Sequence, residues 1–224
     1  MFANAEAKFK SNIEVLTLIE LEEPGDYPDE FERDEKVWLR RPPRSPATTK
    51  KIAECEQLLG RAFSPSYRGF LLKHNGWEKC QLLYDIFGVV DHQSLELRKR
   101  LGGLMRGFLQ GCEAPIQGVS DEEFLPENLY RLADSHTPVV SHLQPLKAFL
   151  DAFEEADDWI CLPKHTIIGA DFANGELILL DRNIEQGKDE ANILRERYSA
   201  VASRHDSFDD WLSYLAEWKI YRSE

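Results

Sequence analysis

The stretch TTKKIAECEQLLGRAFSPSYRGFLLKHNGW, from Thr48 to Trp77, has the pattern of two short amphipathic helices followed by a strand. Apolar residues recur at helical spacing in its first half, and Gly60 stands where a left-handed cap would end that helix. Ser64 and Pro65 then fit the N-cap and the first helical position, where the missing N–H of proline costs nothing. The Asn75–Gly76 pair ends the second helix. This pattern predicts a recognition scaffold rather than a catalytic motif.

Two later segments of the sequence predict further secondary-structure elements. In IIGADFANGELILLDRN, Ile167 to Asn183, the pair Asn174–Gly175 separates two apolar runs. This arrangement predicts a β-hairpin with a two-residue type I′ turn, because both turn residues need positive φ. The block SFDDWLSYL, Ser207 to Leu215, predicts a closing helix in which Ser207 is the cap. The apolar stripe of that helix consists of Phe208, Trp211, Leu212, Leu215 and Trp218.

The order of these elements predicts the fold class. Between the first two helices and the hairpin, Cys80 to Val90 is rich in branched and aromatic residues and predicts a strand or a bent hairpin that ends near Gly88. An apolar run from Ile13 to Leu21 also has the length of a strand. Helices, strands, hairpin and closing helix in this order predict an α+β domain. We expect an antiparallel or mixed sheet with the helices segregated to one face.

The chain divides near its proline-rich segment RRPPRSPATT, which cannot be helical before Thr48 or Thr49. Residues 1–47 are therefore predicted to be an extension that packs on a main domain of residues 48–224. That domain is predicted to contain a helical insertion at about residues 91–160. The predicted insertion helices cover Leu95–Gln110, broken at Gly102 and Gly103, then Pro126–Ala133 and Pro145–Ala156.

Composition limits the classes of partner. The 224 residues include 27 Lys and Arg against 40 Asp and Glu, a formal net charge of −13. This charge repels nucleic acid and anionic membranes and favours a basic partner, although acidity can also serve solubility alone. No apolar run has the ~18 residues needed to cross a bilayer, and the four cysteines show no C-x-x-C pair. We therefore expect a protein of the reducing cytoplasm.

The acidic residues form three groups in the sequence. The largest spans Glu20 to Glu35, where Arg33 is the only opposing charge. The second covers Asp151 to Asp158, and the third consists of Asp206, Asp209 and Asp210. If folding gathers two of these groups on one face, their field would steer a cationic protein toward it. If folding scatters the three groups over the surface, their charges serve only to keep the protein solvated.

The sequence shows no motif for catalysis or for a cofactor. Phosphate loops, dinucleotide-binding glycine patterns, nucleophile elbows and H-E-x-x-H helices are absent. The spacing of His136 and His142 does not suit a metal site. Asp171, Glu176 and Asp181 flank the predicted hairpin, but the sequence gives no sign that two of them share a cleft. We therefore predict no catalytic residues, no metal and no cofactor.

The chain resembles the SUKH superfamily, which includes the yeast cell-wall-synthesis regulator and many bacterial immunity proteins. The family pattern has an Ile-x-x-x-Glu-x-x-Leu-Gly helix, then a proline and an aromatic residue opening the next helix, and Asn-Gly closing it. The hairpin and closing-helix blocks described above are similar to later family blocks, in the family's order. The positions that match the first pattern are Ile52, Glu56, Leu59, Gly60, Pro65, Tyr67, Phe70, Asn75 and Gly76.

The resemblance implies a non-enzymatic binding protein. For a bacterial member, it implies an immunity protein that neutralises a polymorphic toxin, often a nuclease, and an acidic surface suits a basic nuclease. A regulatory adaptor that docks signalling proteins is the alternative, and a carboxylate hydrolase comes third. We predict electrostatic steering by the acidic groups and a buried aromatic anchor. The predicted contact residues are Glu22, Glu23, Asp26, Asp29, Glu30, Trp77, Glu154, Glu155, Asp157, Asp158 and Trp159.

Overall fold

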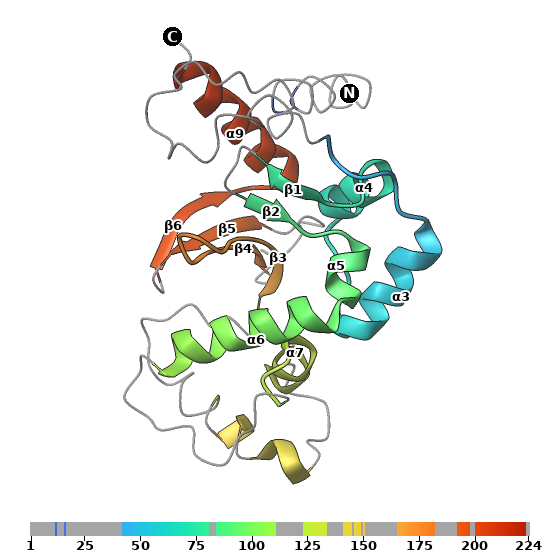
Figure 1. The fold of residues 1–224 in the computed structure, drawn as a ribbon, viewed down its shortest axis with the longest axis vertical. Helices are drawn as coiled ribbons and strands as arrows, with labels where there is room; N and C mark the ends of the chain where they lie inside the picture. The colour runs from blue at the N-terminus through green and yellow to red at the C-terminus, as the bar shows by residue number, and fades with distance from the viewer. Residues whose placement is uncertain are drawn as a thin grey trace, which may run out of the picture.

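A computed structural model of the chain describes residues 42–80, 84–110, 123–133, 141–144, 146–148, 165–181, 192–197 and 200–222, together with Asn12, Leu16 and Leu150. In this described part, a six-stranded antiparallel sheet follows chain order from β1 to β6 (Figure 1). The predicted α+β class and antiparallel sheet are therefore confirmed. The strands are β1 Trp77–Cys80, β2 Tyr84–Ile86, β3 Thr166–Asp171, β4 Glu176–Asp181, β5 Asn192–Arg197 and β6 Ala200–His205.

The two helices predicted before β1 are confirmed. Helix α3, Thr49–Leu59, begins after Thr48, whose side chain accepts a hydrogen bond from the Lys51 N–H at 3.3 Å. It ends at Gly60, which is left-handed with φ 69°. Helix α4, Pro65–Lys73, has proline at its first position and ends just before the Asn75–Gly76 pair. The apolar faces of both helices contribute to the hydrophobic core.

Strand β1 is irregular because it carries one extra residue. Trp77 pairs with Ile86 and Cys80 with Tyr84, so three steps along β1 oppose two along β2. Lys79 lies in this bulge with φ 50°, and its N–H donates to Asp85 Oδ1 at 2.8 Å. Of the two forms predicted for Cys80 to Val90, a strand or a bent hairpin, the structure has the hairpin: β2 pairs with β1, which begins earlier at Trp77. The chain becomes helical at Val89.

The β3–β4 hairpin is confirmed, but its predicted two-residue type I′ turn is wrong. Asp171 pairs with Glu176, which leaves four residues, 172–175, in the loop. Of these four, Gly175 alone has positive φ, at 66°. The Asp171 carboxylate explains the wider turn, because its Oδ1 accepts hydrogen bonds from the N–H groups of Ala173 and Asn174 at 3.0 and 3.2 Å.

The connection from β2 to β3 contains helices, as predicted. They are α5 Val89–Gln93, α6 Leu95–Gln110, α7 Pro126–Ala133 and the 3₁₀ helix η3 Ser141–Leu143. Helix α7 has the predicted bounds, whereas the predicted Pro145–Ala156 helix lies mostly outside the described residues. The predicted break of α6 at Gly102 and Gly103 is wrong, since the helix continues through both. A Cβ on Gly102 would lie 2.3 Å from the Phe124 carbonyl oxygen, so Gly102 lets the chain pass close to the helix.

Alanine at Gly102 and at Gly103 should have opposite effects, although the two residues are neighbours. At Gly102 the methyl group would overlap the Phe124 carbonyl, so we expect the free energy of unfolding to fall by about 2–3 kcal/mol. At Gly103 nothing lies within 4 Å of the added Cβ, and helix propensity should raise the free energy by about 0.5–1 kcal/mol. Urea unfolding followed by circular dichroism measures both variants. Equal effects would contradict the close approach at Gly102.

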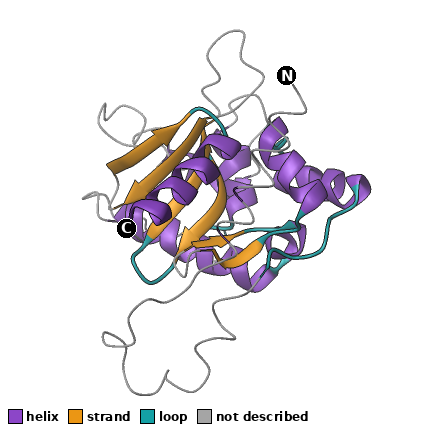
Figure 2. Ribbon diagram, turned by 90° about the horizontal axis from the view of Figure 1, so that it is seen from above, coloured by secondary structure: helices purple, strands orange, loops and turns teal. Residues whose placement is uncertain are grey.

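Helix α9, Phe208–Arg222, closes the fold, and Ser207 caps it as predicted by accepting a hydrogen bond from the Asp210 N–H at 3.1 Å. The helix lies on one side of the sheet, whereas α6 and α7 lie on the other (Figures 1 and 2). Every residue of β3 and β4 is buried, so both faces of the sheet are covered at its centre. The helices therefore flank the sheet on both sides instead of gathering on one.

Two described residues of the N-terminal region contact the rest of the structure. The Asn12 side-chain amide donates to Ser213 Oγ on α9 at 2.8 Å, and Leu16 is 1% exposed. Leu16 is helical, so the predicted Ile13–Leu21 strand is wrong at this residue. The other residues of that run lie outside the described ones. The division at residue 47 stays a prediction.

The outermost strands of the sheet are β1 and β6, and both are bulged. On β6, Val201 pairs with Glu196 and Ser203 with Arg195, so Ala202 is an extra residue. With the bulge at Lys79, each edge of the sheet departs from a regular ladder.

Candidate partner-binding surface

Most of the predicted contact residues lie outside the described part of the chain, and they stay predictions. These residues are Glu22, Glu23, Asp26, Asp29, Glu30, Glu154, Glu155, Asp157, Asp158 and Trp159. Trp77 is described, and it is 2% exposed at the start of β1. In this conformation its indole belongs to the hydrophobic core and offers almost no area to a partner. Burial in the sheet, rather than binding, accounts for its position.

The excess of acidic residues lies in the remainder of the sequence. The described residues contain 18 Lys and Arg and 16 Asp and Glu, whereas the whole chain contains 27 and 40. The described part of the surface is therefore close to neutral. Any acidic surface must come chiefly from segments such as residues 20–35 and 151–158.

The third acidic group is brought together at the junction of β6 and α9. Asp206 and Asp210 are exposed there, and Asp209 is half-buried. The Ser207 hydroxyl donates to Asp210 Oδ2 at 2.9 Å. Both Asp209 and Asp210 lie in the first turn of α9, where negative side chains interact favourably with the helix dipole. The start of α9 therefore accounts for Asp209 and Asp210, and no protein that binds them need be invoked.

The Asn75–Gly76 pair joins the end of α4 to the start of α5. The Asn75 Oδ1 accepts a hydrogen bond from the Val89 N–H at 2.7 Å. Gly76 has φ 88°, and a Cβ on it would lie 2.5 Å from the Gly88 nitrogen. A Cβ on Gly88 would lie 2.1 Å from the Asn75 carbonyl oxygen. Both glycines are needed because the two backbone segments touch.

The same junction is tied to the segment before α3. Arg44 forms a bidentate ion pair with Asp91, and the Asp91 carboxylate also accepts from the Gly88 N–H at 2.6 Å. In α3, the Glu56 carboxylate accepts from the Phe63 N–H at 2.9 Å and pairs with Arg68 at 2.5 Å. The acidic residue of the family-like helix therefore holds the α3–α4 loop in place.

Arg61 follows Gly60 in that loop and is 3% exposed. Its guanidinium donates to the carbonyl oxygens of His165 at 3.0 Å and Tyr130 at 3.1 Å, and it stacks on the Tyr130 ring at 4.2 Å. The Tyr130 hydroxyl accepts from the Ile167 N–H at 3.0 Å. Arg61 thus joins the α3–α4 loop, α7 and the start of β3. One side chain therefore contacts both Tyr130 and His165, which are 35 positions apart in the sequence.

A buried pair of titratable side chains lies between α4 and α5. The Tyr67 hydroxyl donates to the Phe87 carbonyl oxygen and lies 3.2 Å from His92 Nε2. Because that hydroxyl proton is already used, Nε2 must carry a proton and donate to the tyrosine oxygen. Burial lowers the pKa of His92 to about 4, although Asp91 opposes this shift, and burial raises the pKa of Tyr67. The histidine is therefore neutral at pH 7.

The hairpin carboxylates considered for a hydrolase have other partners. Asp171 and Glu176 lie opposite each other in the sheet, and Asp171 holds the loop. Glu176 accepts from the Tyr84 hydroxyl at 3.0 Å, and Asp181 pairs with Arg204 at 2.9 Å. Each carboxylate thus has a structural function in the sheet.

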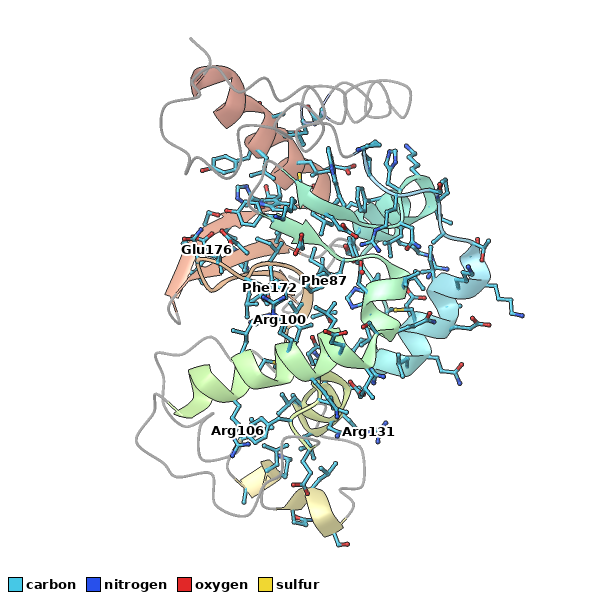
Figure 3. The ribbon with its side chains drawn as sticks, viewed as in Figure 1. Phe87, Arg100, Arg106, Arg131, Phe172 and Glu176 are labelled. Atoms are coloured by element: carbon cyan, nitrogen blue, oxygen red, sulfur yellow. The ribbon has the colours of Figure 1, made fainter. Side chains whose placement is uncertain are left out.

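Helix α6 carries the basic residues Arg98, Lys99, Arg100 and Arg106, and their environments differ. Arg98 pairs with Glu127 of α7, and Arg106 stacks on Phe124 with 5.2 Å between its Cζ and the ring centroid. Arg100 is exposed, and its Cζ lies 3.6 Å from the centroid of Phe172 in the β3–β4 loop. Figure 3 shows Arg100 on the side of α6 that faces Phe172, whereas Arg106 lies on the other side.

Sequence reasoning missed Arg61, the His92–Tyr67 pair and the Arg100–Phe172 stack. The first two join residues at least 25 positions apart, and no local pattern reveals such contacts. The sequence did contain a signal for the Arg100–Phe172 stack, because Phe172 is a large aromatic residue beside the Asn-Gly pair. Turns seldom contain such a residue unless it packs against something.

The described residues contain neither a candidate metal site nor a helix suited to cross a membrane. No group of three or more His, Cys, Asp or Glu side chains there could hold a metal ion. Among the same residues, no helix combines the length and the apolar character that a membrane crossing requires.

Comparison of the sequence with family models shows the family. Residues 46–214 match the model of the SMI1 / KNR4 family (SUKH-1). This range begins just before the Thr48 cap of α3 and ends within α9, so it includes the whole sheet. The chain therefore belongs to the SMI1 / KNR4 family. No curated protein matches it.

Proposed function

We propose that this protein is an immunity protein that neutralises a toxin domain by binding it through an acidic surface. Family membership supports this proposal most directly, because SUKH proteins are commonly immunity proteins and are generally non-catalytic. The net charge of −13 adds support, since a toxin that binds nucleic acid must be basic where it holds phosphates.

The proposed contacts are the acidic residues of segments 20–35 and 151–158, with Trp159 as an aromatic anchor. Trp77 is left out because of its burial. The acidic segments would raise the association rate by electrostatic steering, and this effect should weaken with salt.

Co-expression with a toxin domain encoded beside this gene tests the proposal. The protein should restore growth and form a complex with that domain. A variant that neutralises five acidic residues, E22Q/E23Q/D26N/D29N/E30Q, should lower the association rate about 10- to 100-fold at low salt. A control with three neutralised exposed acids, E54Q/E96Q/E217Q, should lower it less than about threefold.

The outcomes separate the possible functions. Absence of both binding and rescue would contradict the immunity proposal for that toxin. A stable complex without rescue would instead favour the adaptor alternative. If both charge variants slow association equally, the acidic segment 20–35 is not the steering surface.

A further inference from the structure

Arg100 rests on an aromatic platform that is fixed in the core. Its Cζ lies 3.6 Å from the Phe172 ring centroid, close enough for a cation–π contact. Phe172 in turn packs against Phe87 with 6.3 Å between centroids, and Phe87 is 2% exposed. Figure 3 shows these three side chains in succession between α6 and β3. The guanidinium is therefore held by residues that are themselves anchored.

Arg100 makes no other polar contact in the described structure. Glu96 lies one helical turn earlier and is exposed, but the two form no ion pair. Arg98, only two residues away, does pair with a carboxylate, that of Glu127. Arg100 thus combines an exposed charge with N–H groups that no described residue uses. Such a position differs from that of a solvated surface arginine, which has no platform.

A stacked guanidinium is suited to bind a planar anion. Stacking occupies the flat face of the guanidinium and leaves its edge accessible. The parallel N–H donors on that edge match the two oxygens of a carboxylate. The platform also limits the rotamer entropy lost on binding. Arginine and aromatic residues are, moreover, the residues that most often dominate protein interfaces.

We infer that Arg100 and Phe172 form a binding site for a carboxylate, supplied by an Asp or Glu side chain of a protein partner. A nucleic acid phosphate suits the site less, because the net charge of −13 repels a polyanion as a whole. A single carboxylate on a protein surface avoids this repulsion. The inference relies on the proposed function only for the statement that the partner is a protein.

Titration of the whole protein with sodium acetate tests the site without any partner. The arginine side-chain N–H signals are followed in NMR spectra at constant ionic strength. Arg131 serves as the internal reference. Arg131 is exposed, and no stacking ring or ion pair is seen for it among the described residues. We expect the Arg100 signals to shift in a saturable manner. The Arg131 signals should titrate at least about fivefold more weakly.

Phe172→Leu removes the platform but keeps an apolar side chain. We expect it to weaken acetate binding at Arg100 at least about fivefold while the backbone spectrum far from the loop stays unchanged. Equal titration of Arg100 and Arg131, or no effect of Phe172→Leu, would overturn the inference. If inorganic phosphate, compared as the singly charged anion, binds more tightly than acetate, the assignment to carboxylate is overturned.

Binding to the toxin domain provides a second test of the inference. Arg100→Gln should weaken that complex about 10- to 100-fold, whereas Lys99→Gln, a neighbouring exposed cation, should change it less than about threefold. If the complex forms and Arg100→Gln has no effect, this inference fails and the immunity proposal stands. If no complex forms, the proposed function fails for that toxin, and the acetate titration still decides on the site.

Discussion

Replacing Arg61 by methionine is expected to lower the free energy of unfolding by about 3–4 kcal/mol. The buried guanidinium donates to the His165 and Tyr130 carbonyl oxygens and stacks on the Tyr130 ring. Methionine fills similar volume but leaves both carbonyls without these donors, at roughly 1–3 kcal/mol each, and removes the cation–π contact. Urea unfolding followed by circular dichroism measures the change.

Arg131→Met is the matched control, because it makes the same chemical change at an exposed position of α7. We expect it to alter the free energy of unfolding by less than about 0.5 kcal/mol. Arg61→Lys should lie between the two, since an ammonium group cannot donate to both carbonyls from a planar fork. A loss below about 1 kcal/mol in Arg61→Met would show that these contacts do not hold the three segments together.

Stability should fall as the pH is lowered from about 6.5 to about 4, in part because of His92. Its pKa is lowered to about 4 in the folded protein, against 6.5 as its ordinary value. Between these values the unfolded chain binds a proton at His92 that the folded protein excludes. This contribution is fully present above pH 6.5, and about 3 kcal/mol of it is lost by pH 4.

His92→Gln isolates this contribution, because glutamine is not titratable and can still donate to the Tyr67 hydroxyl. We expect the difference in unfolding free energy between wild type and variant to shrink by about 3 kcal/mol from pH 7 to pH 4. Burial and the nearby Lys73 also lower the pKa of His74, but His74 is present in both proteins, so its effect cancels. Parallel stability curves would mean that His92 does not titrate as its burial requires.

Local signals in the sequence located the elements well. Thr48 and Gly60 mark the ends of α3, Pro65 marks the start of α4, and Ser207 marks the start of α9, because caps act within a few residues. Two of the errors had different causes, one a neighbouring side chain and the other a group distant in the sequence. The Asp171 carboxylate widens the hairpin loop, and Phe124 passes so close to Gly102 that the glycine serves a contact rather than a break.

The candidate site was less predictable than the fold. Charge grouping in the sequence cannot show which faces the groups share, and two members of the third acidic group, Asp209 and Asp210, proved to lie in the first turn of α9. Trp77 illustrates a second difficulty, because a tryptophan can serve the core or an interface equally well in sequence terms. The Arg100–Phe172 pair unites residues 72 positions apart, and only the arrangement of α6 against the hairpin brings them together.

The bulges at Lys79 and Ala202 have a consequence for how this protein behaves when it is abundant. A regular outer strand is a template on which another copy can continue the ladder, and this leads to fibres or swapped dimers. One surplus residue on each outer strand disturbs the spacing of donors and acceptors that such growth requires. The two bulges therefore oppose the growth of insoluble polymers when the protein is at high concentration.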